Sequence, residues 1–325
     1  MGDIVAQLTH SAAIEFLLLW FSPNSRSYWL FMIPSVAVAL WLARRERRSN
    51  AAVPPHLRVF SPATWFSRSA LNDYGLVIVN AMIAATLLAP LAIARPETTR
   101  WVAETIGQLA GSIGASPAWW PPVLLTATLF LADDFLRYIL HYAEHRVPVL
   151  WELHKVHHSA EVMNFVTAER HHPLSTLWFQ FGAGLGAAVV NGVFLWLFRE
   201  NLTPVSILGA NALWIASNML CSTLRHSPAW LSFGPRVERW LISPAQHQIH
   251  HSVDPRHYGR NFGSTLAIWD RMFGTHYATG PEREVAAFGL GEETVRYSSF
   301  FALYFVPIAE ACRVSLSTPR RAPAG

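Results

Sequence analysis

The residues best suited to chemistry are two copies of the motif H-x-x-H-H, which begin at His154 and His247. On an α-helix, positions i, i+3 and i+4 share one face, so each copy directs three imidazoles the same way. His141 and His145 form a third cluster at i, i+4 spacing. With 15 histidines in 325 residues, one such motif arises by chance only about 0.03 times, so two copies indicate a shared role. Imidazoles gathered in this way are typical of a metal site.

The number of histidines predicts two metal ions. The three clusters supply eight imidazoles, which exceeds what one ion can hold. Imidazole suits iron, zinc, copper and nickel, so the spacing alone leaves the metal open. Structural zinc sites usually have four ligands, often including cysteine, and do not account for so rich a pattern. For any single histidine, an ordinary buried or surface role remains the alternative.

Acidic residues near the clusters are candidates to orient the imidazoles through their second ring nitrogen. Asp134 precedes His141 by seven residues and shares its helical face. We predict this role for Asp134 and Asp270. The other nearby acids are predicted to be solvated charges: Glu144, Glu152, Glu161, Glu169 and Asp254.

The composition is that of a membrane protein. Hydrophobic residues make up 52% of the chain and charged residues 14%, and the 14 Trp and 19 Phe suit interfacial belts and a lipid-facing surface. Arginine carries almost all of the positive charge, since Lys155 is the only lysine, and no basic run with interleaved aromatic residues points to nucleic acid. The two cysteines, Cys221 and Cys312, form neither a disulfide framework nor a zinc motif.

These features predict an all-α integral membrane bundle of about four to five spans with a cytoplasmic, helical, histidine-rich di-metal cap. The apolar stretches predicted to span are 28–43, 75–94, 122–140, 174–198 and 204–220, with interfacial helices at 12–21 and 300–311. The basic run 44–48 marks the cytoplasmic side, and the resulting topology places all the histidine clusters there. Asp133 and Arg137, inside a predicted span, are functional candidates or already reach the headgroups. Gly182 and Gly186 predict close packing between helices.

Three regions follow from this topology. Residues 1–118 are predicted to form an N-terminal membrane region with an interfacial helix, two spans and an outer loop. Residues 119–296 hold the clusters and form the predicted catalytic domain. Residues 297–325 are predicted to be an interfacial helix and a tail that is disordered from Arg313, because this end is rich in Pro, Arg and Ser.

The clusters and their flanks resemble the three histidine boxes of the fatty acid hydroxylase/sterol desaturase superfamily. The matching boxes are Asp134-x-x-x-Tyr138-x-x-His141-x-x-x-His145, Leu150-Trp151-x-x-His154-Lys155-Val156-His157-His158-Ser159 and Pro244-x-x-His247-Gln248-Ile249-His250-His251-Ser252. Further matches are Arg170-His171-His172-Pro173-Leu174, His226-Ser227, Asn261-Phe262-Gly263 and the segment 269–275. The resemblance covers residues 120–277 in the order and spacing of the family.

The resemblance implies a membrane non-haem di-iron oxygenase with two iron ions and O2 as co-substrate. The implied ligands are His141, His145, His154, His157, His158, His247, His250 and His251, and less securely His226 and His172. For His172 the alternative is a structural role before Pro173. Asn261 joins Asp134 and Asp270 as a supporting residue. No haem-binding domain precedes the membrane part, so a separate electron donor of the ferredoxin or cytochrome b5/reductase type is expected.

Three functions remain open at this point. The first is hydroxylation of an unactivated C–H bond of a fatty acyl chain or acyl-lipid. The second is desaturation or demethylating oxidation of a sterol-like lipid, because Tyr142, Ser175 and Pro228 depart from the family pattern and leave the substrate subgroup open. The third is metal binding or transport, which would require polar residues along the spans. High Ala and Arg usage suggests a bacterial inner membrane, and the endoplasmic reticulum would be the eukaryotic equivalent.

Overall fold

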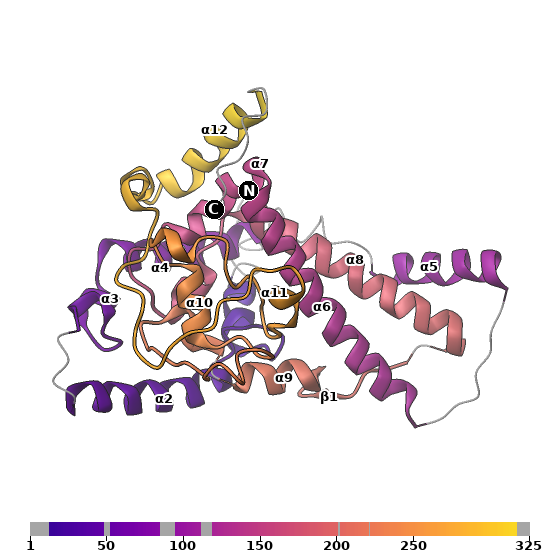
Figure 1. Cartoon of the computed structure of the whole chain (residues 1–325). Helices are drawn as coiled ribbons and strands as arrows, with labels where there is room; N and C mark the ends of the chain where they lie inside the picture. The colour runs from indigo at the N-terminus through magenta and orange to yellow at the C-terminus, as the bar shows by residue number, and fades with distance from the viewer. Residues whose placement is uncertain are drawn as a thin grey trace.

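The computed structural model describes residues 13–48, 53–84, 95–111, 119–200, 202–220 and 222–316, and these residues are mostly helical (Figure 1). The α-helices are α2 (Trp29–Arg48), α3 (Pro62–Trp65), α4 (Arg68–Ile83), α5 (Arg95–Ala110), α6 (Pro121–Arg146), α7 (Pro148–His158), α8 (Pro173–Phe198), α9 (Ala212–Met219), α10 (Pro244–His250), α11 (Ile268–Met272) and α12 (Ala302–Leu316). The short 3-10 helices are η1 (Pro55–Leu57), η4 (Phe165–Glu169), η5 (Ser222–His226), η6 (Pro255–His257) and η7 (Gly291–Tyr297). Within the described ranges the strands are β1 (Ser206–Ile207) and β2 (Ala210–Asn211), an antiparallel pair.

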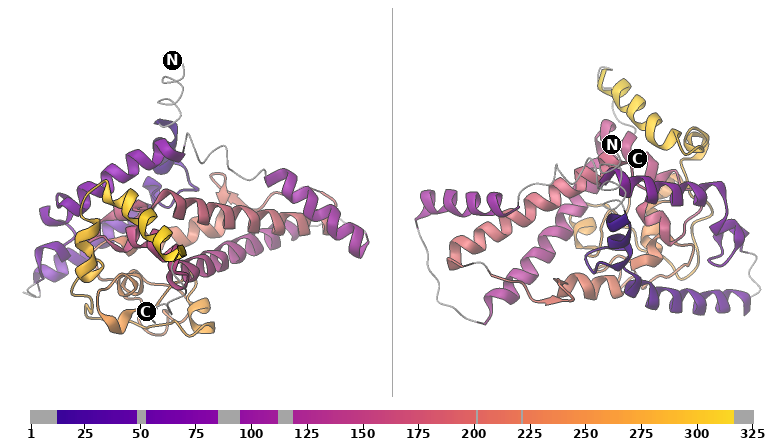
Figure 2. Two further views of the ribbon diagram at one scale, coloured as in Figure 1. Left: turned by 90° about the horizontal axis from the view of Figure 1, so that it is seen from above. Right: turned by 180° about the vertical axis from the view of Figure 1, so that it is seen from behind.

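Helices α6 and α8 lie side by side and project from the body of the molecule, with α5 packed on α8 (Figures 1 and 2). Each of the two is 26 residues long, about 39 Å at 1.5 Å per residue. Their contact depends on glycine. A Cβ atom on Gly182 would lie 2.5 Å from Leu140 Cδ1, and one on Gly186 would lie 2.1 Å from Leu136 Cδ1. The predicted close packing at the two glycines is therefore confirmed.

Most of the predicted apolar stretches are helical, but one is not. Among the described residues, α8 is the one helix long and apolar enough to cross a membrane by itself, and the bent pair η7 and α12, at 115°, meets that test together. The predicted span 204–220 is wrong, because this stretch contains the β1–β2 hairpin and only eight residues of α9. Leu208 and Gly209 take positive φ in the hairpin turn, and the Asn211 side chain caps the start of α9. The turn and the cap prevent one continuous helix over this apolar stretch.

The N-terminal helices and the histidine-bearing region pack together. Helix α4 starts at Arg68, earlier than the predicted span 75–94, since the Ser67 side chain caps it, and the part of that span at 85–94 lies outside the described residues. Leu76 of α4 shares a buried hydrophobic cluster with Val156 of α7 and Leu303 of α12. Helix α7 is thus packed against α4 from the N-terminal part of the chain and α12 from the C-terminal part.

The predicted end regions agree with the structure only in part. Residues 13–21 are helical, as expected for the interfacial helix. Helix α12 continues through Arg313 to Leu316, so the tail predicted to be disordered from Arg313 is helical over its first four residues. The remainder of the tail and Cys221 lie outside the described residues.

Candidate metal centre

Local sequence fixes where each histidine-bearing helix begins. Helices α6, α7 and α10 start at Pro121, Pro148 and Pro244, and proline favours the first helical position because its missing N–H has no intrahelical partner there. Helix α10 also has a reciprocal cap between Ser243 and Gln246. These starts place the histidines of each motif on one helical face, as predicted.

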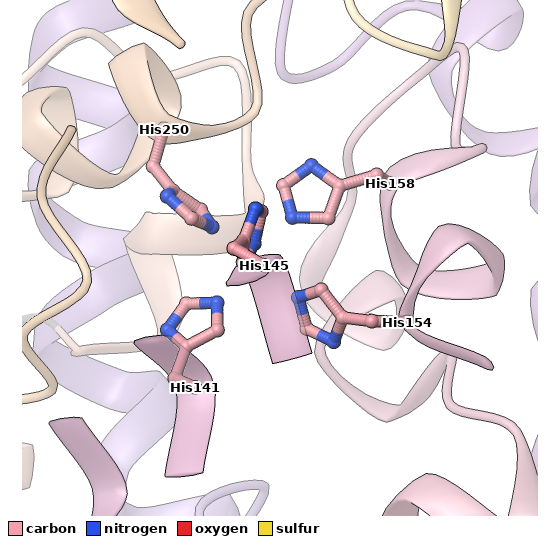
Figure 3. Close-up of side chains that lie close together, drawn as sticks. All are labelled: His141, His145, His154, His158 and His250. Carbon is pink, nitrogen blue, oxygen red and sulfur yellow. The ribbon is translucent and has the colours of Figure 1, made fainter. Parts of the chain in front are cut away.

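The first histidine group contains five residues whose ligand atoms all lie within 4.8 Å of one another: His141, His145, His154, His158 and His250. Their rings come from α6, α7 and α10 and point toward a common centre (Figure 3). All five Nε2 atoms are buried, and none has a hydrogen-bond partner among the residues that the structure describes. Five unpaired buried nitrogens would be costly in a protein without a further occupant, because a buried polar group without a partner costs about 1–3 kcal/mol. A metal ion would supply that partner.

The second group contains His157, His226, His247 and His251, which are all buried. The Nε2 atom of His226 lies 3.1 Å from that of His157 and 2.9 Å from that of His247, and the Nε2 atoms of His247 and His251 are 3.2 Å apart. Nitrogens bound to one ion at about 2.0–2.1 Å stand roughly 3 Å apart. The nitrogen spacing therefore fits a single bound cation.

The opposite ring nitrogens are held by backbone carbonyls. Nδ1 of His141 lies 3.0 Å from the Phe262 carbonyl oxygen, and Nδ1 of His250 lies 2.9 Å from that of Arg260. Nδ1 of His157 lies 3.2 Å from the carbonyl oxygen of Arg170. A carbonyl only accepts, so each Nδ1 must carry the proton and each Nε2 must be free to bind a metal.

Glu144 is part of the site, contrary to the prediction that it is a solvated charge. Its carboxylate is 1% exposed, Oε2 lies 2.6 Å from Nδ1 of His154, and Oε1 accepts a hydrogen bond from the Ser175 hydroxyl. Burial raises the pKa of Glu144, but the contacts with His154 and Ser175 outweigh it and leave the pKa below the usual value. Sequence reasoning missed this pair because it joins two helices across the Val147–Pro148 corner, although an acid directly before His145 was an available signal.

Asp134 and Asp270 are buried, but neither contacts a histidine of the two groups, so their predicted direct role is corrected. Asp134 accepts hydrogen bonds from the backbone of Thr265 and Leu266 and from the Trp269 indole. Asp270 accepts from the Phe262 and Gly263 N–H groups and the Thr275 hydroxyl. Both carboxylates hold the 260–275 loop, which carries the carbonyls that orient His141 and His250.

Asn261 supports the same loop from the position between those two carbonyls. Its backbone takes a positive φ of 56°, its Nδ2 donates to the Gln246 carbonyl, and its Oδ1 accepts from the Tyr277 N–H. Asparagine tolerates this conformation better than most residues. Asn261 thus supports the loop through its backbone conformation and its side-chain hydrogen bonds.

His226 joins the second group, whereas His172 lies in neither group. Nδ1 of His172 accepts from the Leu174 N–H at the start of α8, and its Nε2 lies 3.2 Å from the Tyr304 carbonyl oxygen. Both ring nitrogens of His172 are engaged, so its predicted ligand role is not supported. The neighbouring His171 instead stacks on His157, with ring centres 4.4 Å apart.

Burial favours the neutral form of His158 and His251. Burial, followed by neighbouring imidazoles, lowers the pKa of His158 and of His251 well below the usual value. Burial and His154 lower the pKa of His171 to about 4. Neutral imidazole is the form that binds a metal.

Two hollows adjoin the histidines. A cavity of about 80 Å³ is lined by His157, His226 and His247 of the second group and by Arg26, Arg137 and Arg225. An apolar groove of about 490 Å³ lies between α6 and α8, lined by Leu136, Leu140, Trp178, Phe181, Leu185 and Val189. Leu140 of the groove directly precedes His141 in α6.

Comparison with known proteins gives one family and several relatives. Residues 126–275 match the fatty acid hydroxylase family. The chain is 33% identical to alkylglycerol monooxygenase of Xenopus tropicalis over 175 residues, 53% of this chain and 32% of that protein. It is 29% identical to the ornithine lipid hydroxylase OlsE of Rhizobium tropici over 169 residues, 50% of this chain and 44% of that protein.

A third relative is methylsterol monooxygenase 1 of Rattus norvegicus, 25% identical over 161 residues, 49% of this chain and 48% of that protein. The matched part spans less than half the length of each of these relatives. No solved structure matches the chain. The three similarities cover 161–175 residues, close to the length of the family match at 126–275.

Proposed function

We propose that this protein is a membrane-bound lipid hydroxylase that uses O2 and two iron ions, because residues 126–275 match the fatty acid hydroxylase family. The observation that carries the proposal is the set of five buried, unpaired Nε2 atoms in the first group beside the four clustered nitrogens of the second. Two adjacent groups of imidazoles suit two divalent ions.

The nine clustered histidines would hold the two ions, five in the first group and four in the second. Bound iron would supply activation of O2, with one oxygen atom inserted into a lipid C–H bond and the other leaving as water, at the cost of two electrons and two protons. The protein's own contribution is to fix the ligands. Carbonyl acceptors behind His141, His157 and His250 and the carboxylate behind His154 set the ring tautomers and orientations before any ion binds.

The surroundings of the site support a lipid substrate. The groove between α6 and α8 has an apolar lining, and the similar proteins are named for the oxidation of alkylglycerols, an ornithine lipid and a methylsterol. A buried site with little open water also limits side reactions of a strong oxidant. We expect the protein to lie in the bacterial inner membrane with the histidines facing the cytoplasm, where a separate ferredoxin or cytochrome b5/reductase donor would supply electrons.

A sterol-like substrate is the second candidate, since the similarity to methylsterol monooxygenase 1 favours it. Desaturation or demethylating oxidation would then replace simple hydroxylation. The product separates the two, because hydroxylation adds one oxygen atom and desaturation removes two hydrogen atoms.

The proposal is tested with 18O2 and mass spectrometry of total lipids from cells that express the wild type, His250→Ala or His56→Ala. His250 belongs to the first group, whereas His56 lies outside both and serves as the matched control. A lipid with one 18O atom in the wild type and the control, but not in His250→Ala, is the expected result. Purified wild type should contain about two iron ions per chain. Full product formation by His250→Ala would refute the proposal.

A further inference from the structure

We propose that the cavity beside the second histidine group binds an anionic headgroup of the lipid substrate, a phosphate or carboxylate, through Arg26, Arg137 and Arg225. This inference rests on the proposed lipid oxygenase function and adds the substrate class. The cavity is lined by these three arginines, and none of its lining residues in the described part of the chain is Asp or Glu.

Two of the three positive charges lack an anionic partner. Arg137 is paired with Asp133 at 2.7 Å. The Arg26 guanidinium, at the exposed rim, donates to the neutral Ser264 hydroxyl, and within the described ranges no carboxylate lies within 4 Å of Arg26 or Arg225. Arg225 is partly shielded from solvent and has no such counter-charge, so an anion in the cavity would be stabilised by its guanidinium.

Two donor atoms in the cavity have no hydrogen-bond partner among the described residues. Nε of Arg225 and Oγ1 of Thr223 are both buried, and neither has a hydrogen-bond partner among the described residues. Both belong to the short helix η5, and both side chains line the cavity. A guanidinium and a hydroxyl beside each other are the groups that bind phosphate or carboxylate oxygens. With a volume of about 80 Å³, the cavity holds several water-sized groups, enough for such a headgroup.

The position of the cavity also indicates which carbon reacts. His141 and His154 of the first group and His157, His226 and His247 of the second line the same cavity as the arginines. A lipid whose anionic group contacts Arg225 therefore places the carbons nearest its headgroup beside the histidines. We expect oxidation close to the headgroup and not at the far end of the chain.

The test is equilibrium binding of radiolabelled dodecyl phosphate to the full chain in dodecyl maltoside micelles, without O2 or reductant. Wild type is compared with Arg225→Gln, Arg225→Lys, Arg26→Gln and Thr223→Val. Arg256→Gln is the matched control, because the Arg256 side chain is 77% exposed and pairs with Asp254 away from the cavity. Inorganic phosphate alone is the second ligand, which separates a lipid headgroup from a free anion.

Hydrogen bonds to charged groups contribute about 1.5–3 kcal/mol, or roughly 10- to 150-fold in affinity. Arg225→Gln and Arg26→Gln should weaken dodecyl phosphate binding at least tenfold, and Arg225→Lys should retain part of it. Thr223→Val should weaken binding a few-fold, which keeps the proposal testable if Arg225→Gln does not fold. Arg256→Gln should bind like wild type.

Two results would overturn the inference. One is wild-type affinity for dodecyl phosphate in Arg26→Gln and Thr223→Val. The other is inorganic phosphate binding as tightly as dodecyl phosphate, which would make the cavity a site for a free anion. Because binding is measured without turnover, a failure to incorporate 18O would refute the proposed oxygenase and leave this result standing.

Discussion

Replacing Glu144 with glutamine removes one negative charge from the first histidine group and preserves the shape of the side chain. Glu144 and His154 are 1% and 2% exposed, and their facing atoms lie 2.6 Å apart. The amide oxygen of glutamine can still accept from His154 Nδ1, and the amide nitrogen can donate to the Ser175 oxygen. The substitution therefore isolates the effect of charge on the ligand.

The expected loss of metal affinity follows from that contact. A hydrogen bond to a charged acceptor contributes about 1.5–3 kcal/mol, and a neutral acceptor gives roughly half of this. The difference, about 0.75–1.5 kcal/mol, corresponds to roughly 4- to 13-fold weaker iron binding. Glu144→Ala, which removes the acceptor altogether, should approach the 100-fold upper end for groups that orient metal ligands.

The assay is competition for iron between the purified protein and a chelator of known affinity, with the thermal unfolding midpoint measured in parallel. Ser175→Ala is the matched control, since it removes a neutral donor to Glu144 and leaves the carboxylate facing His154. Its affinity should change less than that of Glu144→Gln. Iron affinity equal to wild type in both Glu144→Gln and Glu144→Ala would refute the role of this carboxylate.

Three other predictions concern pH, the loop behind the ligands and the buried ion pair. Burial holds the pKa values of His157 and His250 well below 6.5, so below that pH the unfolded chain takes up more protons than the folded one. The metal-free protein should lose about 1.4 kcal/mol per pH unit for each such ring as pH falls from 6.5; an unfolding midpoint unchanged between pH 7.5 and 5.0 would contradict this. Gly263→Ala places a Cβ atom 2.7 Å from Asp270 Oδ2 and 2.9 Å from the Leu266 carbonyl oxygen, so it should displace the Phe262 carbonyl and lower iron content. Gly280→Ala, whose nearest neighbour would be 3.6 Å away, is its control, and equal iron content in the two variants would argue against the loop's role. Asp73→Asn leaves the Arg170 guanidinium, 2.6 Å from Asp73 Oδ1, buried without an anion, and should cost about 3–5 kcal/mol of stability. Denaturant unfolding measures this, and a loss below about 1 kcal/mol would disagree with it.

The histidine helices could be predicted from sequence because a single periodicity determines them. Spacings of three and four residues define a helical face without knowledge of the rest of the fold. The placement of His226 depended instead on resemblance, since no local pattern joins it to the motifs. Sequence could not show which of the neighbours His171 and His172 lies beside the histidine groups. Their side-chain directions depend on the path of the chain before Pro173.

The supports behind the ligands could not be predicted because most of them are backbone atoms. The Phe262 and Arg260 carbonyls reach His141 and His250 only through the path of a loop, and sequence spacing does not specify that path. Asp134 was identified as important, but its partners lie about 130 residues away in the chain. The stretch 204–220 shows a similar limit, because apolar composition predicts burial or lipid contact and does not by itself predict a helix.

The distribution of ligands along the chain has a consequence for biosynthesis. The first group combines His141 with His250, and the second combines His157 with His251, so each contains residues about a hundred positions apart. Neither set is complete until α10 has left the ribosome and docked against α6 and α7. In the proposed enzyme, iron capture would therefore be a late event in maturation, and a chain that stops before residue 247 would hold only fragments of both sites. Such a product would lack the means to activate oxygen while the protein is still being assembled.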